Sequence, residues 1–400
     1  MTDRKRVMVL GASRYYSKSI ESVRKAGYRV IAVDRNPQSD AFAIADGAVV
    51  CDIIDKPGVL EAARREKIDG IVSVNDFGVP TAAFVASRLG LSGISEDAAF
   101  LATDKKAMRA RWMADGVPCP RVAHGTTPAE IRAAVAHVTL PCVLKPAHGI
   151  GGGSRGVVVV SSESELDSAI EFAQRFYEDK EVLVESFIDS EFEHSAETVV
   201  HHGDVHVLAL SDKVKSPLPY RVDMHVLYPS KVTGARFEQL KDVCTRAIRS
   251  LGIDRGAVQV ELATTKTGFS LFELGARCGG GGTPEPICTH VSGVNQFLQH
   301  VKIAVGDTDL SLEPMSERAC SYNFIVLTPG RIRTIRDDFD QVRNHPRVLD
   351  AGLLAKPGQT INRLSNGADR AGFTITTGET PEDAMRLGTE LERMVHVEYQ

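Results

Sequence analysis

The sequence predicts a mixed α/β protein built from more than one globular unit. A chain of 400 residues is too long for one ordinary hydrophobic core. The first hundred residues alternate short apolar runs with helical stretches, which is typical of a parallel sheet with crossover helices. Later segments mix strands and helices less regularly, and past about residue 306 the chain becomes β-rich again.

The first hundred residues contain the elements that such a parallel sheet needs. Their apolar runs lack an alternation of period two, which favours strands buried on both faces. Gly27 directly follows the first helical stretch, where glycine is a common stop. The expected strands cover residues 7–13, 28–34, 48–52 and 69–76, and the expected helices cover residues 17–26 and 57–67.

The rest of the chain is expected to combine shorter strands with five helices. A capped, charged amphipathic helix is predicted over residues 102–116, where the mixed region begins. The other helices are predicted at residues 128–137, 163–177, 237–251 and 381–393. Strands are predicted at residues 141–146, 182–188, 257–264, 269–276 and 320–335, with further strands and turns within residues 181–230.

Composition excludes several classes of protein. The net charge of −5 argues against a nucleic-acid scaffold, although a local pocket can still be positive. No apolar run approaches the 18 residues of a membrane span, and the N-terminal residues indicate a first strand rather than a secretory signal. The seven cysteines are spread out and include no C-x-x-C pair, unlike a disulfide framework or a zinc site. We therefore expect a reduced, cytoplasmic protein with neither nucleic acid nor membrane as a partner.

A glycine-rich loop is the strongest local signal in the sequence. The glycines are Gly149, Gly151, Gly152, Gly153 and Gly156. Such density leaves backbone N–H groups free to approach an anion closely, and Lys145 just before the loop adds a cation for phosphate oxygens. A dinucleotide fingerprint would need a helix after the glycines, but another apolar strand, VVVV, follows. The context therefore predicts a hairpin that folds over phosphates.

Two acidic residues form the second signal. Glu261 and Glu273 lie in neighbouring predicted strands joined by the turn TTKTG, so their carboxylates can lie side by side. Two bare carboxylates at that distance would repel each other, and a bound Mg²⁺ would remove the conflict. Arg277 follows four residues after Glu273, where a guanidinium could bind a substrate carboxylate or a transferring phosphoryl group.

Taken in order along the chain, these motifs resemble the ATP-grasp superfamily of carboxylate–amine ligases over about residues 1 to 400. The resemblance implies an α/β fold that is α+β in its ATP-grasp part. A Rossmann-like domain would occupy residues 1–100 and a two-lobed ATP-grasp domain residues 101–305, with a glycine-loop lid at about residues 115–190. A small β-rich α/β subdomain, packed on the ATP-grasp core, would occupy residues 306–400.

The same resemblance assigns ATP contacts to residues of this chain. TDK at residues 103–105 matches the start of the family's central region, and Lys145 matches its second ATP lysine. Residues 182–197 look like the hinge, where Glu185 and the backbone near Phe187 would meet adenine. Glu193 would meet the ribose hydroxyls, with Glu191 as the competing assignment. The ATP-binding set implied is Lys105, Lys145, Gly151, Gly152, Gly153, Ser154, Glu185, Ser186, Phe187, Ile188 and Glu193.

The metal site implied by the resemblance consists of Glu261 and Glu273, which match the family's acidic pair, with Arg277 as its signature arginine. The usual Asn of that signature, a further metal ligand, is replaced by Gly275, so the number of metal ions stays open. The expected cofactors are ATP and Mg²⁺, with Mn²⁺ as an alternative metal.

The stretch ELGARCGG is similar to the form found in L-amino-acid ligases and their relatives. Those enzymes also carry a stretch like residues 211–230 before their final helix. By that resemblance Lys213, His225 and Pro229 lie near the acceptor or phosphoryl pocket. The catalytic residues implied are therefore Arg277, Lys213 and His225.

Other classes of protein fit the sequence less well. A dinucleotide-binding enzyme would need glycine at positions 13 and 16, where the chain has Ser13 and Tyr16. Nothing after residue 330 resembles a biotinylation motif, and the three histidines in HHGDVH fit a hairpin turn better than a metal site. A purine-pathway ligase, carboxylase or transformylase stays open, as do an ATP-grasp kinase and a non-catalytic ATP-binding module.

The function expected is an ATP-dependent ligase, forming a carbon–nitrogen bond. Its substrate would be a small carboxylate, an amino acid or a related acid, activated as an acyl phosphate and joined to an amine with release of ADP and phosphate. The loops at residues 11–16 and 75–78 are expected to help bind these small molecules, and the protein is expected to be a homodimer. The identities of the acid and the amine cannot be predicted, because pocket shape on variable loops selects them.

Overall fold

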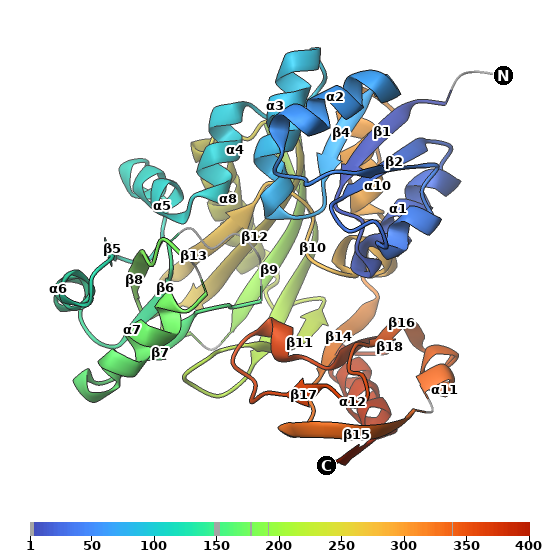
Figure 1. Cartoon of the computed structure of the whole chain (residues 1–400). Helices are drawn as coiled ribbons and strands as arrows, with labels where there is room; N and C mark the ends of the chain where they lie inside the picture. Colours follow the sequence, from blue (N-terminus) through green and yellow to red (C-terminus); the bar gives the residue numbers. More distant parts are fainter. Residues whose placement is uncertain (1–3, 148–152, 177, 191, 338) are drawn as a thin grey trace.

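The computed structural model describes residues 4–147, 153–176, 178–190, 192–337 and 339–400. Figure 1 shows an N-terminal part in blue, a small sheet with its helices in teal and green, and a long sheet that reaches the C-terminal strands. Within the described residues, no helix is both long enough and apolar enough to cross a membrane.

The N-terminal part is a parallel sheet in the strand order β3-β2-β1-β4. Its strands are β1 (Arg6–Leu10), β2 (Arg29–Asp34), β3 (Gly47–Val50) and β4 (Gly70–Ser73), and its helices are α1 (Ser17–Lys25), α2 (Lys56–Glu66) and α3 (Val79–Leu89). The neighbouring strands β1 and β4 are buried along almost their whole length, as their continuous apolar runs predict. The expectation of parallel strands with crossover helices is confirmed.

The second part is a four-stranded antiparallel sheet in the order β5-β8-β6-β7. It consists of β5 (Val122–Gly125), β6 (Cys142–Pro146), β7 (Val158–Val160) and β8 (Val182–Ser186), with the helices α6 (Pro128–Val138) and α7 (Leu166–Gln174). These elements enclose a hydrophobic core of their own. The glycine loop joins the paired strands β6 and β7, so the predicted strand–loop–strand hairpin is confirmed.

The third part is an eight-stranded antiparallel sheet in the order β13-β12-β9-β10-β11-β14-β18-β16. Its strands are β9 (Glu193–His201), β10 (Asp204–Lys215), β11 (Asp223–Tyr228), β12 (Gly256–Thr265), β13 (Gly268–Gly275), β14 (Ala319–Ile325), β16 (Val348–Leu353) and β18 (Gly372–Gly378). The helices of this region are α4 (Glu96–Thr103), α5 (Lys105–Ala114), α8 (Gly234–Ser250), α9 (Cys288–Ser292), α10 (Gln296–Ala304) and α12 (Pro381–Glu392). The turn at His202 and Gly203 connects β9 to β10, as expected for HHGDVH.

The C-terminal residues share a sheet with the preceding part of the chain, whereas they were expected only to pack against it. Three of their strands, β14, β18 and β16, continue the long sheet instead of only packing against it. A separate small sheet has the order β17-β15-β19. Its strands are β15 (Gly330–Asp337), β17 (Thr360–Ile361) and β19 (Val395–Tyr399), and the short helix α11 (Phe339–Arg343) lies nearby.

Two helices differ from the expectation. The single helix predicted over residues 102–116 is split into α4 and α5 at Asp104, whose backbone is extended. Its carboxylate accepts a hydrogen bond from the Ala107 N–H at 2.8 Å and so caps α5. The helix predicted at residues 163–177 begins as a 3₁₀ turn and continues as α7 only to Gln174.

Candidate active site

A cavity of about 640 Å³ lies where all parts of the chain meet. The N-terminal part contributes Tyr15, Tyr16, Asn75 and Asp76, so the loops expected near the small substrates do reach it. The four-stranded sheet contributes Lys145 and Glu185, and the long sheet contributes most of the charged residues.

A buried ion triad stands at the side of the cavity formed by the four-stranded sheet. Glu185 on β8 accepts from Lys145 on β6, with 2.7 Å between Nζ and Oε2, and from Arg109 on α5, with 2.8 Å between Nε and Oε1. All three side chains are buried. Burial alone would raise the pKa of Glu185, but the two cations outweigh it and hold this pKa below its usual range. The carboxylate therefore stays ionised and fixes Lys145 at the cavity wall.

The predicted acidic pair is confirmed in geometry. Glu261 on β12 and Glu273 on β13 are direct partners in the antiparallel register, and both line the cavity. Lys213 Nζ lies 2.5 Å from Glu261 Oε1, and Lys105 Nζ lies 3.1 Å from Glu273 Oε1. Two of the lysines that the sequence singles out thus neutralise the two carboxylates.

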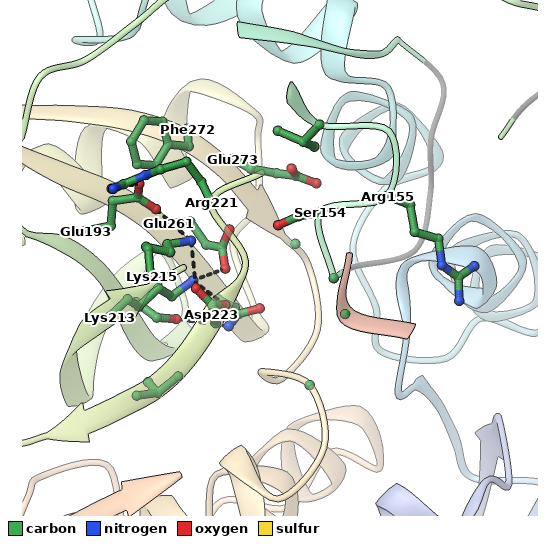
Figure 2. A pocket seen from close by; sticks show the side chains of 18 of the residues that line it. Ser154, Arg155, Glu193, Lys213, Lys215, Arg221, Asp223, Glu261, Phe272 and Glu273 are labelled. Atoms are coloured by element: carbon green, nitrogen blue, oxygen red, sulfur yellow. Dashed lines mark hydrogen bonds and ion pairs between the residues drawn. The ribbon is translucent and has the colours of Figure 1, made fainter. Parts of the chain in front are cut away.

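A dense network of opposite charges surrounds Lys213. Figure 2 shows Lys213, Lys215 and Asp223 pointing toward one another, with Glu193 and Arg221 beside them. Lys215 Nζ lies 2.6 Å from Asp223 and 2.7 Å from Glu193. Burial alone would raise the pKa of Asp223, but the two lysines hold it well below its usual range.

The charge of Lys213 follows from the same network. Burial alone would lower the pKa of Lys213, but the carboxylates of Asp223 and Glu261 outweigh it and raise this pKa. Lys213 therefore stays a cation, which suits charge stabilisation and not proton abstraction.

Arg277 lies between the long sheet and the N-terminal part. Its Nη2 donates to Asp76 at 2.9 Å, and its Nη1 donates to the side-chain oxygen of Gln259. Tyr16 lies close to this pair, and burial raises the pKa of its hydroxyl to about 12. The arginine is thus held by contacts from both sides of the cavity.

The remaining ATP-binding residues expected from the sequence fall into two groups. Gly153, Ser154, Ser186, Phe187, Ile188 and Glu193 line the cavity. Gly151 and Gly152 of the loop, and Glu191 as the alternative to Glu193, lie outside the described residues. The hinge and the described end of the glycine loop therefore face the same space as the acidic pair.

His225 is not among the described residues that line the cavity, so its expected catalytic role stays a prediction. On β11 the cavity is lined by Asp223, Val226 and Tyr228, and His225 lies on the face opposite to Val226 because neighbouring side chains alternate along a strand. There its Nδ1 lies 3.0 Å from Oδ1 of Asn323. Pro229 is likewise absent from the described residues that line the cavity.

Several residues of the site were missed by sequence reasoning. Lys215 lies two residues after Lys213 and faces the same side of β10, so the period of a strand could have revealed it. Arg109 is part of a helix that reads as charged and exposed, although it is fully buried. Arg370 and the aromatic residues Tyr322 and Phe373 also line the cavity, but no local motif marks them.

Comparison with known families agrees with this geometry. Residues 104–312 match the family described as carbamoyl-phosphate synthase L chain, ATP binding domain, which covers more than half of the chain. The chain therefore belongs to this family, whose members are ATP-grasp ligases. Residues 323–400 match a second family, L-amino acid ligase C-terminal domain 2. The protein is an ADP-forming ATP-grasp ligase that makes a carbon–nitrogen bond and uses ATP with Mg²⁺.

Individual relatives span the whole chain. An uncharacterized protein of Sinorhizobium fredii is 27% identical over 393 residues, which cover 95% of this chain and 80% of the relative. A formate-dependent phosphoribosylglycinamide formyltransferase of Maridesulfovibrio salexigens is 24% identical. The matched region covers 99% of this chain and 97% of the relative. The crystal structure of an L-amino acid ligase from Bacillus licheniformis superposes with a TM-score of 0.82 at 22% identity and covers 100% of both chains.

The residues present fit a hard divalent cation held together with a nucleotide. Glu261 and Glu273 offer carboxylate oxygens from adjacent strands into one cavity, which suits Mg²⁺. The described part of the chain offers no cluster of three or more His, Cys, Asp or Glu residues for a metal. Two protein carboxylates, with the remaining ligands from phosphates and water, are a usual arrangement for Mg²⁺.

Proposed function

We propose that the chain activates a small carboxylate, an amino acid or a related acid, as an acyl phosphate and joins it to an amine. The observation that carries this proposal is the convergence of the acidic pair, the lysines and Arg277 on one cavity. The match of residues 323–400 to an L-amino acid ligase domain supports an amino acid as the acid.

The proposed ATP contacts follow from where the residues lie. Lys105, Lys145 and the glycine loop would hold the phosphates, and residues 185–188 would hold adenine, with Glu193 at the ribose. Glu261 and Glu273 would hold Mg²⁺, which when bound neutralises phosphate charge. The protein's part is then mainly positioning and charge stabilisation.

The proposed handling of the substrate depends on Arg277 and Lys213. Arg277 would orient the carboxylate, because its guanidinium lines the cavity and is fixed by Asp76. Lys213 would stabilise the negative charge that develops on phosphoryl transfer, since its pKa keeps it charged.

The experiment that tests this function measures substrate-dependent ADP release and traps acyl phosphate with hydroxylamine. Amino acids and other small carboxylates would be screened with and without amines. We expect Glu273→Gln to lower ADP release by about 10²–10³-fold, the usual effect of losing one group that stabilises charge in the transition state. Glu238→Gln, an exposed site on α8, is the matched control and should keep full activity.

Two results would contradict the proposal. Unchanged ADP release in Glu273→Gln would remove the metal assignment. A phosphorylated alcohol as the product, with no hydroxamate formed, would make the protein a kinase.

A purine-type reaction is the second candidate, because a formate-dependent phosphoribosylglycinamide formyltransferase matches along almost the whole chain. ADP release that requires formate together with phosphoribosylglycinamide, and not amino acids, would favour it. The domain boundaries given above, the homodimer and the cytoplasmic location stay predictions.

A further inference from the structure

Arg370 enters the cavity from the C-terminal part of the chain. It directly follows the turn Gly367–Asp369 and precedes β18. Its Nη2 donates to the backbone oxygen of Asp223 at 2.7 Å. Its Nε is buried and has no hydrogen-bond partner among the described residues. A buried donor without a partner is costly, so this guanidinium, which lines the cavity, has hydrogen-bonding capacity that the described residues leave unused.

Aromatic rings form the wall around this guanidinium. The Arg370 guanidinium carbon lies 3.6 Å from the centroid of the Phe324 ring. The Tyr322 ring lies 4.5 Å from that of Phe324 and 5.6 Å from that of Phe373. Tyr15 extends the wall from the N-terminal part, 5.8 Å from Phe373 and partly exposed in the cavity. The corner is therefore largely aromatic around this cation, and the Asp223 carboxylate lies near enough to oppose the lowering of the pKa of Arg370 by burial.

The cations elsewhere in the cavity differ from Arg370 in their partners. Arg277 pairs with the carboxylate of Asp76, and Lys213 pairs with that of Glu261. At Arg370, by contrast, the described hydrogen-bond acceptor is the backbone carbonyl of Asp223, whose nearby carboxylate pairs with Lys215 and Lys213. A guanidinium stacked on a ring keeps its edge available for a planar carboxylate, which it can bind through two parallel hydrogen bonds.

The chemistry of the proposed ligase calls for such a second anion site. If the amine substrate is itself an amino acid, its carboxylate must be held away from the activating site so that only its amino group reaches the acyl phosphate. Arg277 belongs to the activating site beside Glu261 and Glu273. Arg370 lines the same cavity but is stacked on Phe324 of the C-terminal strand β14.

We propose that Arg370 and the aromatic wall of Tyr15, Tyr322, Phe324 and Phe373 bind the amine substrate, and that this substrate is an amino acid with an apolar side chain. Arg370 would bind its carboxylate and the rings its side chain. This inference rests on the proposed ligase function and names the class of its second substrate. A phosphate is the less suitable ligand, because a dianion in a largely aromatic corner would need more than one cation.

Calorimetric binding tests the assignment directly. Wild type, Arg370→Met, Arg370→Lys and the control Arg363→Met would be titrated in the presence of Mg²⁺ and a non-hydrolysable ATP analogue. Arg363 is exposed in the same segment and is absent from the described residues that line the cavity. The probes are L-phenylalanine and L-leucine, each compared with its amide, and inorganic phosphate.

We expect wild type and Arg363→Met to bind the acids about 10- to 100-fold more tightly than the amides, the ratio that corresponds to one charge-assisted hydrogen-bonded pair. Arg370→Met should lose the part of this preference that the Arg370 subsite supplies and keep only what binding beside Arg277 contributes, and Arg370→Lys should restore part of the loss. Equal binding of the ATP analogue and an equal Tm would show that the variants are folded.

Three results would overturn the assignment: no preference for acid over amide in wild type, the same preference in Arg370→Met, or Arg370-dependent binding of phosphate in place of the amino acids. The hydroxylamine assay needs no amine substrate, so it tests formation of the acyl phosphate independently of the Arg370 subsite. Should hydroxamate fail to form while Arg370-dependent binding persists, the ligase mechanism falls and the subsite stands.

Discussion

Glu185 is a buried residue that lines the cavity and also holds a set of charged contacts that stabilise the fold. Its carboxylate is enclosed between Arg109 and Lys145, and removal of one member of a buried ion set leaves the others uncompensated. We therefore expect Glu185→Gln to lower the free energy of unfolding by about 3–5 kcal/mol near pH 7. Urea unfolding without nucleotide measures this. The matched control is Glu171→Gln, which removes an exposed pair with Arg175 and should change stability by less than about 1 kcal/mol.

The same pair of variants has a defined pH dependence. The folded pKa of Glu185 is lower than its ordinary value of 4.5, so the stabilisation is complete above pH 4.5 and is lost as the pH falls through the folded pKa. The difference in unfolding free energy between wild type and Glu185→Gln should therefore be constant from pH 7 down to about pH 5 and shrink below it. A difference that grows on acidification would contradict the ion triad.

At the scale of residues, the sequence predicts those parts of the site that local order determines. Glu261 and Glu273 could be placed side by side because a short turn joins their strands. Arg109 lies on the helix α5 and could not be placed, because its partner Glu185 lies 76 residues away on the strand β8. His225 could not be placed on one face of β11, because a motif carried over from a resemblance does not fix the alternation of side chains along a strand.

The glycine loop and the turn at Gly367–Asp369 touch each other at the scale of elements. The Gly367 N–H donates to the Gly153 carbonyl at 2.5 Å, and a Cβ added at Gly367 would lie 2.9 Å from the Gly153 Cα. The contact thus depends on the absence of a side chain at Gly367. The same turn leads directly into Arg370, so it connects the glycine loop to the part of the cavity that Arg370 lines.

Gly367→Ala should weaken this contact without unfolding the protein. We expect an increase of roughly 3- to 10-fold in the KM for ATP, corresponding to the loss of about one hydrogen bond, with an unchanged Tm. The control is Gly47→Ala, where an added Cβ meets only ordinary contacts, with Ile31 as the neighbour at 3.5 Å. Steady-state kinetics at saturating acid and amine give the KM, and equal values in both variants would show that the contact has no part in ATP binding.

Elements with strong periodicity were predicted, and elements that depend on distant contacts were not. The crossover helices and the β6–β7 hairpin follow from apolar runs and glycine positions. The helices α9 and α10 were missed, since they follow a glycine- and proline-rich run that indicates a loop. The long helix expected after residue 101 was divided because Asp104 prefers to cap a helix.

At the scale of the whole molecule, one hydrophobic cluster joins the N-terminal sheet to the ATP-grasp region. Val7 and Val30 of the N-terminal strands share this cluster with Phe297 and Val301 of α10. Figure 1 shows α10 beside the blue strands although it follows them by more than two hundred residues. The sequence pattern predicts the order of the parts along the chain. It does not predict this shared core, because apolar periodicity does not determine which faces of different elements pack together.

The shared cluster predicts that these parts unfold together. Phe297→Ala should lower the free energy of unfolding by about 3–5 kcal/mol, the usual cost of deleting a buried ring. Trp112 is the one tryptophan and is buried in the ATP-grasp core, so its fluorescence reports that region while far-UV circular dichroism reports the whole chain. Both midpoints should move by the same amount in denaturant, because a single cooperative transition makes probes coincide. Phe100→Ala, at an exposed ring, should leave both in place. A dichroism midpoint that shifts while the fluorescence midpoint stays would show that the N-terminal sheet unfolds independently.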